Sequence, residues 1–233
     1  MHLLLAVLTI AAASDLQPVM PRVAAAFEQA TGHTVKVAYG SSGSFFAQIS
    51  NGAPYDVFLS ADVDYPRKLE SAGLTVPGSL VLYAKGELAV WAPRASGMDT
   101  TAGLNVLLDD RIRRIAIANP EHAPYGRAAV RALTSAHLYD RLKPRLVFGE
   151  NVSQAAQFVQ SGNAEAGILP LSLAKSLEPT GTYAVVPPVL YPAIQQAAVV
   201  LKRTREAAAA RAFVDFLQTR EAADILAQAG FTR

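Results

Sequence analysis

The segment at residues 39–49, YGSSGSFFAQI, combines small hydroxyl side chains with glycines, as in a turn that leads into a helix. Ser42 stands at the expected start of that helix, where backbone N–H groups lack partners within the helix and the helix dipole is positive. Such a helix start binds anions without a cationic side chain, and the segment contains no Lys or Arg. The segment is therefore suited to bind an anion through uncharged hydrogen-bond donors.

Similar turns recur along the chain. The run LTIAAA leads to Ser14, RIAIA leads through NPEHAPYG to a helix, and RLVFGEN leads to Val152. Short β-branched runs that alternate with helical patterns indicate βαβ units and mainly parallel sheets. Because the carboxyl ends of parallel strands share one edge of a sheet, these helix starts could converge on a small, multiply charged oxyanion. A serine at a helix start also serves simply to satisfy its own helix, so the turns alone leave both interpretations open.

The expected helices are recognised by the period of their apolar residues. In the first, apolar positions follow one helical face as far as Phe27, and Gly32 is expected to end it. Pro21 either kinks this helix or marks its real start. Gly162 is expected to end the helix that begins at Val152.

The composition argues against several kinds of partner. The 233 residues include 21 Lys and Arg against 19 Asp and Glu, and the net charge is +2. This balance gives no broad field for nucleic acid or an anionic membrane, and the basic run at residues 111–114 is interpreted as a solvated edge. The chain has no Cys, which excludes disulfides and thiolate sites. The length and the 51% of hydrophobic residues permit one or two domains.

The longest apolar run, residues 3–13, is too short for a membrane-spanning helix, which needs about 20 residues. It begins like the apolar part of a secretory signal but lacks a basic stretch before it. We therefore expect LTIAAASDL to be a first core strand entering a turn, and a signal peptide to have been removed or altered.

No enzyme motif accompanies the turns. The sequence has no HExxH, no G-x-S-x-G, no P-loop lysine after GSSG and no G-x-G-x-x-G after a strand. His122 could be imagined in catalysis, and so could Asp56 and Asp62 as an acid–base pair. A loop role for the histidine and turn roles for the carboxylates are the simpler interpretation, so we expect neither catalysis nor a cofactor.

Longer strings point to one family. AAASDL, SSGSFFAQI, NGAPYDVFLSAD, NPEHAPYG and LYPAIQQAAVV occur in this order. With them the chain, from about residue 8 to the terminal GF, resembles the molybdate-binding proteins of bacterial ABC transporters, a class of periplasmic substrate-binding protein. The resemblance implies a periplasmic monomer that captures molybdate, and tungstate with it, and delivers it to a transporter permease. It implies no insertion into the membrane.

The resemblance also implies a fold. This is the two-lobe type II periplasmic binding protein fold, an α/β architecture with mainly parallel sheets flanked by helices and a hinge of two chain crossings. Lobe one would hold residues 1–86 and 193–233, and lobe two residues 87–192. The candidate crossing strands are ELAVWAP and PAIQQAAVV. The oxyanion would lie in the cleft between the lobes.

The family's ligands transfer onto the turns described above. The resemblance assigns to the anion the hydroxyl and N–H of Ser14 and of Ser42, with the N–H of Asp15 beside them. In lobe two it assigns Tyr125 of the PYG turn and the backbone N–H of Val152.

Selectivity depends on the remaining groups near these turns. Some members of the family place a Tyr hydroxyl on the anion where this chain has Pro170, which offers neither hydroxyl nor N–H. A carboxylate aimed at a dianion would repel it, so we expect the side chains of Asp15 and Glu150 to point away. Arg127 is taken as a helix-surface residue. A binding protein for another oxyanion, such as sulfate or phosphate, is the alternative.

Overall fold

The computed structural model describes residues 5–233, so residues 3 and 4 of the apolar run lie outside this range. The chain divides into two units, each with its own five-stranded sheet. The first unit contains the chain up to Lys85 together with Gln195–Gln228 and Thr232–Arg233. The second contains Gly86–Ile194 and Ala229–Phe231.

The sheet of the first unit has the strand order β2-β1-β3-β10-β4. Strands β1, β2 and β3 run parallel, whereas β10 runs antiparallel to β3, so the sheet is mixed. The last four residues of β1 and all of β3 are buried, as expected for strands with both faces covered. The bounds are β1 Val7–Ala13, β2 Thr34–Gly40, β3 Val57–Ser60, β4 Val81–Gly86 and β10 Ile194–Val200.

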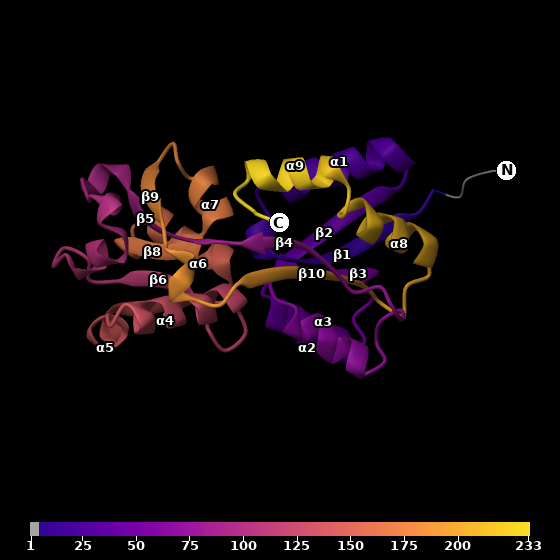
Figure 1. Cartoon of the computed structure of the whole chain (residues 1–233), viewed down its shortest axis with the longest axis horizontal. Coiled ribbons are helices and arrows are strands. Elements are labelled where there is room, and N and C mark those ends of the chain that lie inside the picture. The colour runs from indigo at the N-terminus through magenta and orange to yellow at the C-terminus, as the bar shows by residue number, and fades with distance from the viewer. Residues whose placement is uncertain (1–4) are drawn as a thin grey trace. The chain divides into compact units, whose positions relative to one another are not determined.

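Helices cover both faces of this sheet. Figure 1 shows α1 and α9 along one side and α2 and α3 along the other. Phe27 of α1 is fully buried and meets Phe213 and Phe216 of α8 edge to face, with ring centroids 5.1 and 5.7 Å apart. The bounds are α1 Met20–Thr31, α2 Ser42–Ser50, α3 Asp64–Ser71, α8 Ala207–Phe216 and α9 Arg220–Gln228.

The helix ends follow from local chemistry. A 3-10 turn, η1 (Ser14–Leu16), comes first, and α1 begins only at Met20. Pro21 therefore marks the start of the helix and does not kink it, because its ring and missing N–H are tolerated in a first turn. The predicted ends are confirmed: Gly32 has φ 78° after α1, and Gly162 has φ 76° after α6 (Val152–Gln160).

The second unit has the strand order β7-β6-β8-β5-β9. Strand β6 pairs in parallel with β7 and β8, and β5 pairs antiparallel with β8 and β9, so this sheet is also mixed. The ring of Trp91 lies so close to Gly181 that any Cβ there would clash. The bounds are β5 Leu88–Pro93, β6 Ile115–Ala118, β7 Leu146–Gly149, β8 Ala166–Pro170 and β9 Gly181–Val185.

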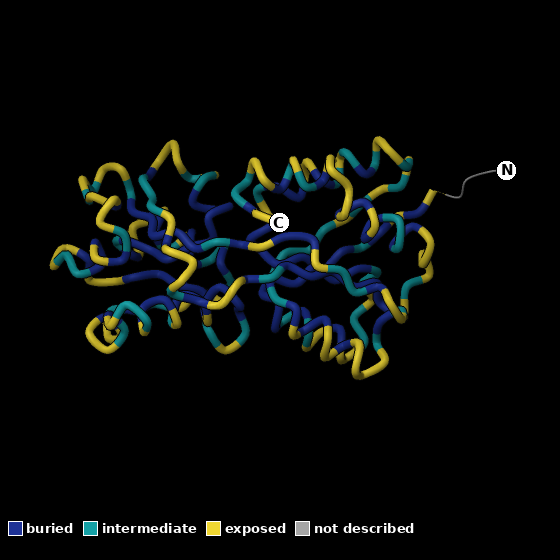
Figure 2. The backbone as a smooth tube through the Cα atoms, viewed as in Figure 1, coloured by how far each residue is buried: buried dark blue, intermediate teal, exposed yellow. Residues whose placement is uncertain are grey.

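The helices of the second unit lie on both sides of its sheet. Figure 1 shows α4 and α5 below the strands and α7 above them. Figure 2 shows buried backbone in the interior and exposed outer helix surfaces, and the buried strands are the inner ones, β5, β6 and β8. No helix within residues 5–233 is both long and apolar enough to cross a membrane. The bounds are α4 Pro124–Ser135, α5 Tyr139–Leu142, α6 Val152–Gln160 and α7 Leu171–Ser176, with 3-10 segments η2 Arg94–Ser96, η3 Thr100–Leu108, η4 Lys143–Arg145 and η5 Pro188–Leu190.

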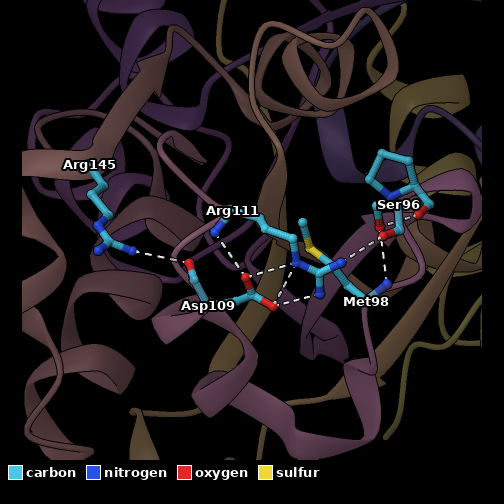
Figure 3. Close-up of polar contacts among 6 residues, drawn as sticks. Ser96, Met98, Asp109, Arg111 and Arg145 are labelled. Carbon is cyan, nitrogen blue, oxygen red and sulfur yellow. Dashed lines mark hydrogen bonds and ion pairs between the residues drawn. The ribbon is translucent and has the colours of Figure 1, made fainter.

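The basic run at residues 111–114 forms exposed ion pairs, which confirms that it is a solvated edge. Arg111 donates to the carboxylate of Asp109 at 2.6 Å and to the Ser96 carbonyl at 3.3 Å (Figure 3). Arg114 pairs with Glu165 at 3.0 Å. Exposed pairs of this kind contribute little to stability.

The Arg111 pair predicts a displaced titration. Side-chain hydrogen bonds from Arg111, and then its backbone N–H, lower the pKa of Asp109 from 3.8 to about 2. Because the folded-state pKa is depressed, the ionised pair stabilises the fold above the ordinary pKa, and this contribution disappears as the pH falls toward 2. We expect an NMR titration of the Asp109 carboxyl to have its midpoint near pH 2 and Arg111→Gln to raise that midpoint. Arg113→Gln is the control, and an Asp109 midpoint that Arg111→Gln leaves unchanged would contradict the assignment.

Candidate functional site

In the first unit, the predicted residues lie at the edge where the parallel strands β1, β2 and β3 end. Ser14 directly follows β1, and the last residue of β1, Ala13, is in register with Gly40 at the end of β2. The Ser14 hydroxyl donates to the Gly40 carbonyl at 3.0 Å, and Ser14 is buried. This bond holds the turn after β1 against the turn after β2.

Helix α2 is capped by the residue before Ser42. The side chain of Ser41 accepts from the Ser44 N–H at 3.1 Å, which satisfies one donor of the first turn. Ser42 and Gly43 are the first two residues of the helix, where N–H groups have no acceptor within the helix. The ordinary capping role that the sequence left open for Ser42 therefore belongs to Ser41.

The Ser42 hydroxyl is oriented by the neighbouring strand. Its oxygen accepts from the N–H of Ala61, just beyond β3, at 3.0 Å. A hydroxyl that accepts in this way keeps its proton to donate elsewhere. Ser42 is buried, so this geometry gives it a defined donor direction at the sheet edge.

In the second unit, the helices approach the strand ends very closely. A Cβ on Gly126 would clash with the carbonyl of Ala118, the last residue of β6. A Cβ on Gly149, at the end of β7, would lie 2.5 Å from the Ala155 nitrogen of α6. Ala118 and Gly149 are register partners. Both helices begin at the same edge of the sheet because β6 and β7 are parallel, and glycine at each point of contact permits the close approach.

Helix α6 has its own cap. The Asn151 side chain accepts from the Gln154 N–H at 3.1 Å, and the Gln154 side chain accepts from the Glu150 N–H at 2.6 Å. This reciprocal arrangement resembles a capping box. Val152 is the first residue of α6, and its N–H has no acceptor within the helix.

Helix α4 begins with Pro124, followed by the buried Tyr125. Ala123 stands at the cap position without a side-chain cap bond, and its carbonyl accepts from the Arg127 N–H at 3.1 Å. The N–H groups of the first turn point out of the N-terminus of α4. Arg127 is exposed, as expected of a helix-surface residue.

The structure thus places the predicted residues at two sheet edges. Ser14, Asp15 and Ser42 lie at the carboxyl edge of the first sheet, and Tyr125 and Val152 lie at the carboxyl edge of the second. Each edge offers amide or hydroxyl donors.

The two carboxylates near these edges differ in their surroundings. Asp15 is fully buried, and its Oδ2 accepts from the Gln196 side chain at 2.9 Å, while Glu150 is exposed. Sequence reasoning missed Gln196, although a buried glutamine in the apolar strand PAIQQAAVV is itself a signal. Pro170 ends β8 and precedes α7, where it supplies no donor.

Asp56 and Asp62 have turn and structural roles, as the sequence suggested. Asp56 accepts from the Thr9 N–H at 2.7 Å and from the Thr204 hydroxyl at 2.6 Å. Asp62 accepts from the Tyr65 N–H at 3.1 Å. In the part of the chain that the structure describes, no group of three or more His, Cys, Asp or Glu side chains is suited to a metal ion.

The sequence matches the family described as bacterial extracellular solute-binding protein over residues 8–232. The chain belongs to this family. It is 40% identical over 221 residues to the molybdate-binding protein ModA of Rhodobacter capsulatus, covering 95% of this chain and 86% of that protein. It is also 40% identical over 224 residues to ModA of Azotobacter vinelandii, covering 95% of this chain and 88% of that protein.

Solved structures show the same fold. The periplasmic molybdate-binding protein of Azotobacter vinelandii matches with a TM-score of 0.90 and 36% identity, covering 97% of this chain and 99% of that one. The sulfate-binding protein SubI of Mycobacterium tuberculosis matches with a TM-score of 0.80 at 17% identity, which shows the fold alone. The predicted two-lobe α/β fold is confirmed, and each of its sheets is mixed.

The assignment of the α2 cap predicts a difference between two serines of one helix. We expect Ser41→Ala to lower the free energy of unfolding by about 1 kcal/mol, because the Ser44 N–H loses its acceptor. Ser50→Ala at the exposed end of α2 is the matched control and should change it by less than about 0.5 kcal/mol. Urea unfolding followed by circular dichroism measures both, and equal effects of the two variants would contradict the assignment.

Proposed function

We propose that this protein captures molybdate, and tungstate with it, in the periplasm and delivers it to the permease of an ABC transporter. The observation that carries the proposal is the pair of capped helix starts. Ser41 and Asn151 cap α2 and α6, so the N–H groups of Ser42 and Val152 remain for an anion. The named molybdate-binding relatives, at 40% identity over nearly the whole chain, support molybdate as that anion.

The proposed ligand set draws on both units. It comprises the hydroxyl and N–H of Ser42, the N–H of Ser14, the N–H of Asp15, Tyr125 and the N–H of Val152. The Ser14 hydroxyl, which the family resemblance also assigns to the anion, would have to leave the Gly40 carbonyl in order to donate to it. In this proposal, residues 1–86 with 193–233 and residues 87–192 are the two lobes, and their donors act on one anion in an interlobe cleft. Closure around the anion would create the form that the permease recognises.

Neutral donors are strong enough for this task. A hydrogen bond to a charged group contributes about 1.5–3 kcal/mol, so six such bonds give about 9–18 kcal/mol before the costs of association and closure. Micromolar to nanomolar binding requires about 8–12 kcal/mol. The proposed site therefore needs no Arg or Lys.

A site of donors alone also selects by protonation state. Molybdate, tungstate and sulfate are unprotonated dianions near neutral pH, whereas phosphate carries a proton that requires an acceptor. The Asp15 carboxylate is hydrogen-bonded by Gln196 and Glu150 is exposed, so we assign neither to a phosphate proton. We propose that the protein is a monomer and has neither a catalytic step nor a cofactor, in keeping with its family of binding proteins.

The proposal is tested by thermal unfolding against a panel of oxyanions at matched ionic strength. Ligand at 1,000 times its Kd should add about 4 kcal/mol to the free energy of unfolding. We expect molybdate and tungstate to raise Tm and phosphate to leave it unchanged. A shift with sulfate or phosphate but not with molybdate or tungstate would refute the proposed ligand, and no shift with any anion would refute the site.

Ser42→Ala tests one donor. Loss of the hydroxyl should weaken molybdate binding by about 1–3 kcal/mol, measured as Kd by isothermal titration calorimetry. Ser50→Ala in the same helix is the matched control and should keep the wild-type Kd. Because the Ser42 oxygen also accepts from the Ala61 N–H, the Tm without ligand is measured for both variants. An unchanged Kd for Ser42→Ala would remove this hydroxyl from the ligand set.

A further inference from the structure

Three buried polar side chains of the first unit form a continuous hydrogen-bonded chain. The Tyr83 hydroxyl donates to Oε1 of Gln196 at 3.3 Å, and Nε2 of Gln196 donates to Oδ2 of Asp15 at 2.9 Å. Asp15 and Gln196 are 0% exposed and Tyr83 is 4% exposed. Buried polar groups that satisfy one another hold a single arrangement, because any other leaves a desolvated group unpaired.

One end of this chain is the turn after β1. Asp15 follows Ser14 directly, and Ser14 is bonded to the end of β2. Strand β10 runs antiparallel to β3 with Ala197 opposite Ser60, so Gln196 lies at the edge where β3 ends. The Gln196 amide thus reaches Asp15 at the edge that carries the proposed donors.

The other end of the hydrogen-bonded chain lies beside two of the places where the polypeptide passes between the units. The polypeptide leaves the first unit after Lys85 and returns at Gln195, and the short segment Ala229–Phe231 crosses again. Tyr83 precedes the first crossing by two residues, and Gln196 immediately follows the second. The two strands that carry these crossings, β4 and β10, are neighbours in the sheet.

The chemistry of the three side chains decides which group donates and which accepts along the hydrogen-bonded chain. Burial, and then the charge of Asp15, raise the pKa of Tyr83 well above its ordinary value of 10, so its phenol stays a neutral donor. The Asp15 oxygen accepts, which orients the Gln196 amide with Nε2 toward Asp15 and Oε1 toward Tyr83. The Gln196 amide therefore has one fitting orientation, with Tyr83 as its donor and Asp15 as its acceptor.

We propose that Asp15, Gln196 and Tyr83 form a relay that couples the anion-binding turn to the two crossings carried by β4 and β10. Gln196 and Tyr83 are positioning residues for anion capture that do not touch the anion themselves. Closure on the anion moves the crossings, and the relay ties that movement to the orientation of the Ser14–Asp15 turn. This inference rests on the proposed capture of molybdate.

Tyr83→Phe tests the relay with the smallest change, the loss of one hydroxyl. Bound molybdate is released into excess tungstate, and the molybdenum retained on the protein is measured over time by mass spectrometry. We expect dissociation about three- to tenfold faster than in the wild type, as for the loss of one buried hydrogen bond, and an association rate within about twofold. Tyr55→Phe is the matched control, because the Tyr55 hydroxyl donates to Gln48 at 3.1 Å away from the relay.

A second variant separates coupling from stability. Gln196→Leu breaks both bonds, and adding Tyr83→Phe to it should not accelerate release further, because both changes interrupt one relay.

A purely structural role would lower Tm without ligand in Tyr83→Phe and keep wild-type release, and that result would overturn the inference. Accelerations that multiply in the double variant would overturn it as well. A wild-type protein that retains no molybdate would instead refute the proposed function, and the inference with it.

Discussion

The proposed site depends on backbone N–H groups that helices cannot satisfy internally. In each unit, parallel strands end beside the first turns of the helices that follow them. In the second unit, helix and strand come so close that Gly126 and Gly149 cannot carry a Cβ. This close packing brings amide dipoles to the sheet edge without charged side chains. A rigid array of neutral donors suits a dianion, because the donors need little rearrangement when it binds.

A division of roles between adjacent residues makes these donors available. Ser41 and Asn151 cap their helices, and the next residues, Ser42 and Val152, retain the unsatisfied N–H groups. The Asp15 carboxylate is a negatively charged acceptor next to these donors. It is buried beside the proposed donors, where its Oδ2 accepts from the Gln196 amide. Of the proposed donors, the Ser14 hydroxyl is engaged by the Gly40 carbonyl, which holds the first two turns together.

What the sequence could predict was local. The turns and the helix ends at Gly32 and Gly162 follow from residue types within a few positions, and the fold followed from a resemblance along most of the chain. The antiparallel strands within each sheet were not predicted, because pairing between distant strands leaves no local pattern. The bond between Asp15 and Gln196 joins residues 181 positions apart. The division of capping between Ser41 and Ser42 required the geometry of the helix start, since either serine fits the sequence pattern.

The central claim, that uncharged donors hold the anion, is tested most directly by a crystal structure of the protein grown with molybdate. Anomalous scattering at the molybdenum edge locates the metal without ambiguity. We expect one molybdenum peak. The oxygens of the molybdate at this peak accept from Ser14, Ser42 and Val152, and no Lys or Arg nitrogen contacts them. A peak gripped by a guanidinium or ammonium group, or one remote from these helix starts, would contradict it.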